Sequence, residues 1–317
     1  GLIVSLLEWH YIFLVNIPIG IVILALSVKI FIKKKIEFNI QHLDVIGAIL
    51  QCVGMILFFG AFIVSQEKGL ENKSVILAVV VSVFLFIIFG IVEKKHSNPL
   101  IELGIFRNKL FSINLVCAFL SFTCIAASTI LLPFYFQYTL KLSASVTGFL
   151  LIVSPVVLAL FSPLCGSISD RIGREKMCLI GLTVMAIAFI LLSTLKTNSI
   201  AIIVMLFMGL MSLGQALFQP ANNVLVMSNC PRNQLGVAGS INSLVRNLGQ
   251  IVGITLSTTV LYVFMSYKCG YKVSGYTFGQ DEVFVYGMKR VYIILSILCC
   301  VGVIVNLIRV LKVSKVE

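Results

Sequence analysis

Charged residues are scarce in this sequence: they make up 11% of its 317 residues, against about a quarter in an ordinary soluble domain. Hydrophobic residues make up 59%. A soluble chain of this length needs polar residues to cover its outside, and too few are available here, so lipid must supply the outer environment. The composition excludes disordered, collagen-like, disulfide-stapled and nucleic-acid-binding proteins.

Residues that bind metals or form disulfides show no recognisable spacing. The nine cysteines lie mostly inside apolar runs, with no CxxC pair and no His-paired metal motif, so we interpret them as small hydrophobic residues. His10, His42 and His96 stand at the ends of apolar runs, where a polar ring at the membrane interface is the simplest interpretation. We therefore expect no metal site and no cofactor.

Long apolar runs are what the sequence does contain. A membrane-spanning helix needs about 20 mostly apolar residues, and runs of that length without strict alternation are helices rather than barrel strands. The sequence therefore predicts an all-α membrane protein with nine transmembrane helices, near Tyr11–Phe31, Leu43–Val64, Val75–Val92, Phe111–Tyr135, Val146–Cys165, Met177–Leu195, Ile200–Gln219, Val237–Phe264 and Val291–Leu311.

Lysine and arginine are unevenly divided between the alternating loops. One set of loops holds 15 of the 24, namely Lys29, Lys33, Lys34, Lys35, Lys94, Lys95, Arg107, Lys109, Arg171, Arg174, Lys176, Arg232, Arg309, Lys312 and Lys315. The other set holds eight, namely Lys68, Lys73, Lys141, Lys196, Lys268, Lys272, Lys289 and Arg290, while Arg246 lies inside a span. The positive-inside rule places the richer set in the cytoplasm, so the first residue is expected outside and the C-terminus inside. The net charge of +12 then records topology rather than a polyanionic partner.

The loop after the fifth window contains Gly166, Asp170, Arg171, Gly173 and Arg174 in the pattern Gly-x-x-x-Asp-Arg-x-Gly-Arg. Glycine permits a close helix crossing or a tight turn, and an acid among basic residues can bridge helix ends. The pattern resembles the loop signature of the major facilitator superfamily, which joins the second and third helices of a six-helix half. When the windows are counted from the one that begins at Phe111, this loop joins the second window to the third. An ordinary cytoplasmic loop is the alternative.

Two further stretches resemble the fourteen-span drug:proton antiporters of that superfamily. The stretch Trp9–Gly20 is similar to the Trp-Arg-Trp-Ile-Phe-x-Ile-Asn-x-Pro-x-Gly motif that opens their sixth helix, although His10 and Tyr11 replace its Arg and second Trp. The stretch Gly209–Gly253 is similar to the fourth and fifth helices of their C-terminal half. If the first window is the sixth helix, the eight windows that follow it are the seventh to the fourteenth. The resemblance therefore implies that the chain holds helices six to fourteen of such a protein.

Polar residues within the apolar windows are the candidates for a substrate cavity. Asn242, Arg246 and Gln250 share one face of a helix at i, i+4 and i+8, beside Gly249-x-x-x-Gly253, which favours a close helix contact. Arg246 lies about 18 Å past the expected helix start, too deep for its charge to reach water easily, so it is a functional candidate. The alternative to a functional role is that Arg246 is a structural residue whose side chain is bound to backbone carbonyls. The other candidates, which can equally form helix–helix hydrogen bonds, are Gln215, Gln219, Asn114 and Tyr135.

Carboxylates are absent from the middle of every window. All 12 acidic residues fall at window ends or in loops. A proton relay needs a titratable group in a buried cavity, so proton coupling would need an acid elsewhere in the protein. Because residue 1 is a glycine inside an apolar run, without an initiator methionine or a signal peptide, we interpret the chain as a fragment and expect a missing N-terminal half of the same protein.

The sequence thus predicts a partial major facilitator fold: residues 1–32 close the N-terminal half, residues 33–110 form two linker helices, and residues 111–317 form the C-terminal six-helix half. The resemblance implies export of drug-like or amphipathic small molecules by alternating access, powered by protons, from a bacterial plasma membrane. The alternatives are an exporter of one metabolite or siderophore and a non-transporting scaffold. An enzyme is not expected, because no His/Asp/Glu or Ser/His cluster is visible. The segment 266–285 is either a lid or an ordinary outer loop.

Overall fold

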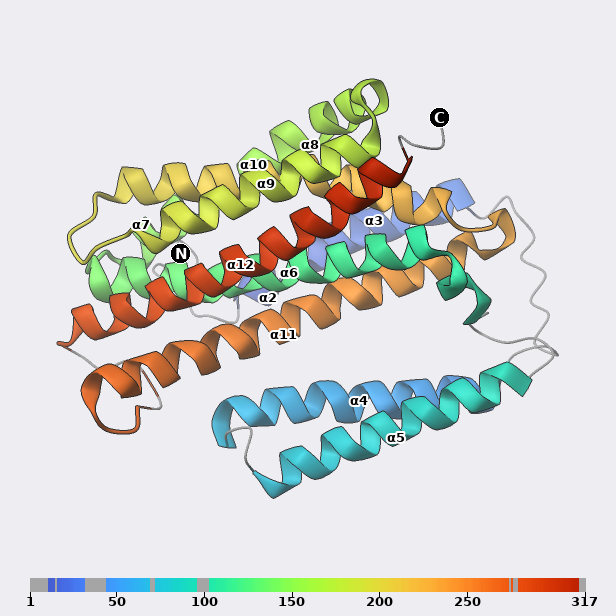
Figure 1. Cartoon of the computed structure of the whole chain (residues 1–317), viewed down its shortest axis with the longest axis horizontal. Helices are drawn as coiled ribbons and strands as arrows, with labels where there is room; N and C mark the ends of the chain where they lie inside the picture. Colours follow the sequence, from blue (N-terminus) through green and yellow to red (C-terminus); the bar gives the residue numbers. More distant parts are fainter. Residues whose placement is uncertain are drawn as a thin grey trace.

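A computed structural model describes residues 11–14, 16–31, 44–68, 72–95, 103–273, 275 and 279–313. These residues form helices joined by short turns, and Figure 1 shows most of the helices running lengthwise through the molecule. In chain order the elements are α2 (Tyr11–Leu14), α3 (Asn16–Phe31), α4 (Val45–Lys68), α5 (Lys73–Lys95), η2 (Leu103–Arg107), α6 (Lys109–Phe134), η3 (Tyr135–Thr139), α7 (Ala144–Leu151), α8 (Val153–Ile172), α9 (Arg174–Ser193), α10 (Ala201–Ser228), η4 (Arg232–Gln234), α11 (Leu235–Cys269) and α12 (Asp281–Val313).

Eight of the described helical segments are long and apolar enough to cross a membrane, with α7 and α8 counting as one. They correspond to the last eight windows of the sequence prediction. The first window corresponds to α2 and α3, in which the apolar part, Asn16–Ile30, is a shorter helix. Almost every described residue of α3 is exposed. The all-α membrane fold is confirmed.

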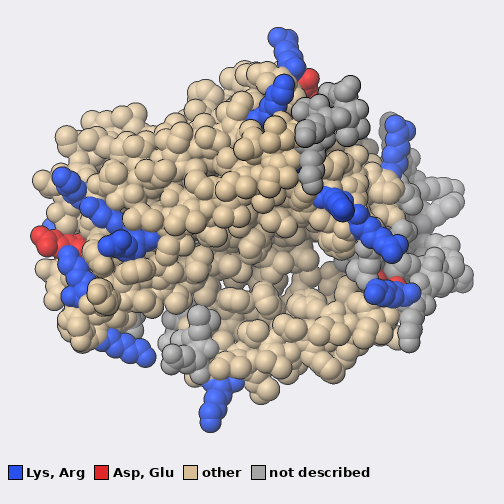
Figure 2. Space-filling view, viewed as in Figure 1, with Lys and Arg blue, Asp and Glu red and all other residues tan. Residues whose placement is uncertain are grey.

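The bundle from α6 to α12 surrounds a large apolar core, and a second, smaller apolar cluster lies among Phe111, Val226 and Ile241. Helix α6 is the most buried of the spans, and it packs against α10, α11 and α12. The core contains stacked aromatic side chains such as Phe189 of α9 and Tyr292 of α12, whose ring centroids are 6.2 Å apart. Helices α4 and α5 form a separate hairpin that touches the bundle through α11 (Figure 1). Charged side chains gather toward the two ends of the helices, and an uncharged band lies between them (Figure 2).

Three helix ends differ from the sequence prediction. Helix α10 continues through Pro220 to Ser228, because neighbouring helices can satisfy backbone groups that a proline leaves free. Helix α11 extends to Cys269, and α12 begins at Asp281. The expected outer loop 266–285 is therefore largely helical at both ends, and Lys289 belongs to a helix rather than to a loop. The fifth span is interrupted at Ile152, one turn before Pro155, because a proline inside a helix removes a backbone hydrogen bond to the preceding turn.

Glycines set the closest approach in the bundle. Gly249 and Gly253 of α11 face the backbone of α6, where an added Cβ would lie 2.8 Å from the carbonyl oxygen of Phe119 and 2.9 Å from the Cα of Thr123, respectively. Real Cβ atoms essentially never come that close, so the predicted close contact beside the polar stripe is confirmed. Helices α9 and α10 meet in the same way at Gly181 and Gly214, where each Cβ would lie 2.8 Å from the other glycine's oxygen.

Candidate functional site

The polar stripe of α11 borders the glycine face by which this helix packs against α6. Gly249 and Gly253 are buried against α6. Within the stripe, Asn242 is half-buried, and Arg246 and Gln250 are exposed. Among the described residues, no carboxylate pairs with Arg246. The long charged side chain therefore projects from an otherwise apolar bundle, and it needs a polar neighbour or water when the protein lies in a membrane.

A second polar stripe follows α10. Gln215, Gln219 and Asn223 are spaced at i, i+4 and i+8, and Gln215 Nε2 donates a hydrogen bond of 3.2 Å to Gln219 Oε1. Gln215 is buried, while Gln219 and Asn223 are half-buried. Asn223 was not among the candidates taken from the sequence, although its place one turn after Gln219 is the signal that identifies it.

The two stripes meet at one hydrogen bond, in which Asn242 Nδ2 donates to Asn223 Oδ1 over 3.0 Å. Helices α10 and α11 are consecutive, and this bond joins Asn223 near the end of α10 to Asn242 near the start of α11. The structure thus places five of the seven cavity candidates on two polar stripes, one on each helix, that meet at this bond. The carbonyl oxygen of the Asn242 side chain has no hydrogen-bond partner within the described residues, so it remains available to a ligand or to water.

Asn114 has a different position, in a buried cluster of polar side chains. Asn114 is 0% exposed, and its Oδ1 accepts a short hydrogen bond from Arg309 Nη1 of α12. Arg309 is 3% exposed, and its Nη2 lies 3.9 Å from Glu175 Oε1 at the start of α9. Asn306, one turn earlier on α12, also lies buried there.

Burial of Arg309 corrects its assignment to a cytoplasmic loop. Arg309 lies within the last apolar window, and α12 continues past it to Val313, so the side chain enters the bundle rather than water. The sequence signal for the cluster was present, because Asn306 and Arg309 are i and i+3 within one window. Only the packing of α6, α9 and α12 shows that their polar groups converge.

Tyr135 is also fully buried, away from the two stripes. Its hydroxyl donates a hydrogen bond of 2.5 Å to the backbone oxygen of Lys196, in the turn between α9 and α10. Tyr135 therefore anchors that turn to the end of α6. The sequence left open whether Tyr135 lines a cavity or forms a hydrogen bond between helices. In the structure its hydroxyl bonds the turn at Lys196.

The loop between α8 and α9 holds the gate candidates at one end of the bundle. Gly173 has φ +104°, a conformation that other residues rarely adopt, so the predicted tight turn is confirmed. Asp170 accepts two hydrogen bonds from Arg174, at 2.9 and 3.2 Å, in an exposed i, i+4 pair, while Arg171 is exposed. An added Cβ on Gly166 would lie 4.0 Å from Pro220, an ordinary contact, so that crossing with α10 does not require glycine.

Two of the acids at window ends are buried where α4 begins and α5 ends, at the open end of the α4–α5 hairpin. Asp44 and Glu93 are each 2% exposed, and an added Cβ on Gly47 would lie 3.0 Å from Glu93 Oε2. Asp44 Oδ1 also accepts a hydrogen bond of 2.8 Å from the backbone nitrogen of Gly47, which caps the start of α4. These carboxylates lie at helix ends, not at the middle of a span.

Comparison with known proteins agrees with this architecture. The chain matches the Major Facilitator Superfamily over residues 1–253 and 114–313. It is 25% identical over 317 residues to the riboflavin transporter RibZ of Clostridioides difficile, covering 99% of this chain and 66% of that protein. It is 26% identical to the multidrug transporter protein MdtP of Bacillus subtilis, covering 82% of this chain and 48% of that protein. The multidrug export protein EmrB of Haemophilus influenzae is 27% identical, covering 81% of this chain and 51% of that protein. The chain thus spans about half to two thirds of the length of these relatives.

Proposed function

Because the chain belongs to the major facilitator superfamily, we propose that it works within a fourteen-span antiporter that exports drug-like or amphipathic compounds by alternating access. Influx of protons across the plasma membrane supplies the energy. The residues 111–317 act as the C-terminal six-helix half, and α4 and α5 act as linker helices. The chain is a multi-pass membrane protein of a transporter superfamily, and its relatives are named as transporters rather than as enzymes.

The observation that carries this proposal is the polar face of α10 and α11. An exposed arginine and an exposed glutamine in the middle of a lipid-facing bundle are unfavourable unless a second helical half or an aqueous path covers them. The Asn223–Asn242 hydrogen bond closes this face at one end, and the stripes continue from it along both helices. A substrate cavity between two halves would account for the exposed Arg246 and Gln250, which have no hydrogen-bond partner among the described residues.

The test is a transport assay on inverted membrane vesicles that contain the protein as the cell makes it. A panel of a cationic dye, lincomycin and riboflavin is offered with a proton gradient and then with the gradient collapsed. Uptake of several unrelated compounds that stops without the gradient supports a multidrug proton antiporter. Uptake that is insensitive to the gradient contradicts proton coupling, and no uptake of any member contradicts drug export.

A transporter of one metabolite is the second candidate. It is favoured by the riboflavin transporter RibZ, which matches 99% of this chain. The same panel separates the two functions, because a narrow transporter moves one compound and leaves the others outside.

Replacement of Arg246 by alanine is expected to reduce transport by about tenfold or more while leaving membrane insertion and the melting temperature unchanged. The guanidinium group is exposed within this bundle, so its removal costs little packing, whereas loss of a charge from the cavity changes what the cavity binds. Arg246→Lys should restore part of the activity. Arg232→Ala, at the exposed turn before the same helix, is the matched control and should transport normally. Normal transport by Arg246→Ala would remove this residue from the proposed site.

Asp170→Asn is expected to slow transport with little effect on stability. An exposed i, i+4 ion pair contributes less than about 1 kcal/mol, so a transport defect would report on the gate rather than on folding. Arg174→Gln breaks the same pair from the other side and is the control. If Asp170 also contacts a neighbouring helix during the transport cycle, Asp170→Asn will transport more slowly than Arg174→Gln. Unchanged transport by Asp170→Asn would exclude a gate at this position.

A further inference from the structure

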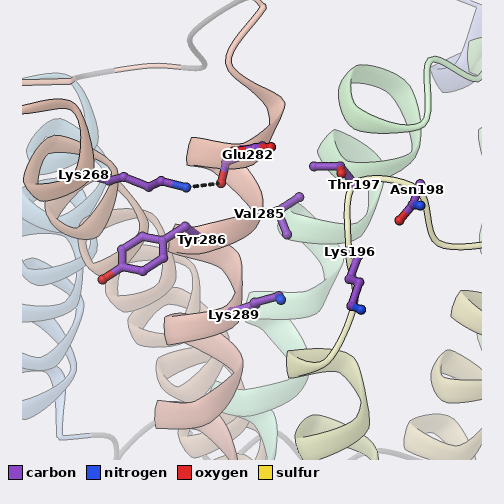
Figure 3. Close-up of a pocket in the computed structure, with 8 residues that line it drawn as sticks. All are labelled: Lys196, Thr197, Asn198, Lys268, Glu282, Val285, Tyr286 and Lys289. Carbon is purple, nitrogen blue, oxygen red and sulfur yellow. Dashed lines mark hydrogen bonds between the residues drawn. The ribbon is translucent and has the colours of Figure 1, made fainter.

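A pocket of about 290 Å³ opens at the end of the bundle opposite the α8–α9 loop (Figure 3). It lies between the turn that joins α9 to α10, the last turns of α11 and the first turns of α12. The charge distribution predicts that this end faces outside. The residues lining the pocket are Lys196, Thr197, Asn198, Lys268, Glu282, Val285, Tyr286 and Lys289. Neither polar stripe contributes to it, so the pocket is separate from the proposed transport site.

Three lysines from three different elements converge on this pocket. Lys196 comes from the α9–α10 turn, Lys268 from α11 and Lys289 from α12, and Figure 3 shows Lys289 pointing toward Lys196. Within the described part of the chain, none of them pairs with a carboxylate. Lys268 Nζ donates to the backbone oxygen of Glu282, at 3.3 Å, and not to its side chain. One exposed acid against three lysines leaves the pocket with an excess of positive charge.

Neighbouring groups fix the Lys268 side chain and the backbone of Lys196. The ammonium group of Lys268 lies 5.3 Å from the ring centroid of Tyr286, which forms one wall. The backbone nitrogen of Lys196 donates a hydrogen bond of 2.8 Å to Ser199 Oγ, and the backbone oxygen of Lys196 accepts the one from Tyr135. Lys289 is half-buried above the buried side chain of Val285. The three lysines therefore project toward the pocket from fixed backbone positions, and the Lys268 ammonium group is also positioned by the Tyr286 ring.

Like charges brought together without a counter-ion repel one another, and a bound anion removes that repulsion. Lysine ammonium groups bind phosphate as point charges, and the threonine and asparagine at the rim add hydrogen-bond donors. The volume is slightly below the range of drug-sized ligand sites, so it suits a phosphate-bearing head group rather than a whole drug. We propose that this pocket is a binding site for a phosphate group, presented either by an anionic lipid or by a soluble phosphate compound.

The position of the pocket is compatible with both sources. Tyr267 and Tyr271, beside the end of α11, are exposed large aromatic side chains, as is common where helices meet lipid head groups. Anionic head groups at that depth attract nearby lysines. The opening also faces the aqueous end of the bundle, where a soluble phosphate can enter.

The experiment measures two probes on purified protein in a neutral detergent. Binding of inorganic phosphate is followed by thermal shift, and binding from vesicles of phosphatidylglycerol, with phosphatidylcholine vesicles as the neutral comparison, is followed by native mass spectrometry. Wild type is compared with Lys289→Gln and Lys196→Gln. Lys272→Gln, which removes the same charge from an exposed residue outside the pocket, is the control.

We expect wild type and Lys272→Gln to bind at least one probe, and both pocket variants to bind it about tenfold more weakly. Binding of phosphatidylglycerol alone identifies a lipid head group, and binding of inorganic phosphate identifies a soluble source. If wild type binds neither probe, or if the pocket variants that still fold bind as wild type does, the proposal is wrong. Each variant's melting temperature without probe shows whether it folds, and the transport assay is not involved in either outcome.

Discussion

Replacement of Gly253 by alanine is expected to destabilise the protein by about 3 kcal/mol, at the upper end for an overpacked site, and replacement by leucine to leave little folded protein. An added Cβ would overlap the backbone of Thr123, and backbone atoms of a central helix cannot move aside as the end of a flexible side chain can. Helices α6 and α11 would have to separate along the contact that holds the polar stripe in place. The measurement is the fraction of monodisperse protein and its melting temperature in detergent.

Gly60→Ala and Gly90→Ala are the matched controls for this experiment. Both glycines lie in the α4–α5 hairpin, and no neighbouring atom lies within 4 Å of an added Cβ at either position. Alanine is the better helix former by about 1 kcal/mol, so these variants should be as stable as wild type or slightly more stable. If Gly253→Ala melts together with the controls, α6 and α11 do not approach as closely as described.

Asn114→Leu is expected to destabilise the bundle by about 3–5 kcal/mol, because it leaves the guanidinium group of Arg309 buried without its principal hydrogen-bond acceptor. Glu175 is 3.9 Å away and does not replace that contact. Arg309→Met should cost less, because it removes the buried charge; it leaves the Asn114 amide without that partner, and the Glu175 carboxylate that also loses it is partly exposed to solvent. Unfolding free energies in a detergent titration provide the measurement.

The double variant Asn114→Leu with Arg309→Met makes this prediction specific. If the charge causes the loss, the double variant will be more stable than Asn114→Leu alone, since no buried ion remains. Arg174→Met, which breaks an exposed ion pair, is the control and should cost less than about 1 kcal/mol. If the double variant loses the sum of the unfolding free energies that the two single variants lose, then the shape of the side chain, and not the charge of Arg309, determines the effect of Asn114→Leu.

Hydropathy predicted most of the helices because it acts locally. A run of about 20 apolar residues has no stable alternative to a helix in lipid, so eight windows correspond to eight spans. Helix ends were less predictable. Pro220 and the charged residues Lys289 and Arg290 suggested boundaries, yet the helices continue through them.

The candidate site was predicted in part. The i, i+4 spacing correctly grouped Asn242, Arg246 and Gln250 on one face, because that spacing depends only on helix geometry. It did not show that Asn114 contacts Arg309 or that Tyr135 anchors the turn at Lys196, because these partners lie 195 and 61 residues away in the chain. The direction in which each helix is rotated depends on packing against the others, which one-dimensional spacing does not contain.

The sequence by itself determined the membrane class, eight of its nine predicted long apolar helices and the glycine contact of α11, since apolar length and residue size do not depend on distant partners. The tertiary structure decided which of two arginines is buried: Arg309 enters the bundle, while Arg246 is exposed on its polar face. It also brought Lys196, Lys268 and Lys289 to one pocket from three elements. The physical reason is that the burial of a charge is set by the helices around it, and only packing in three dimensions places those helices.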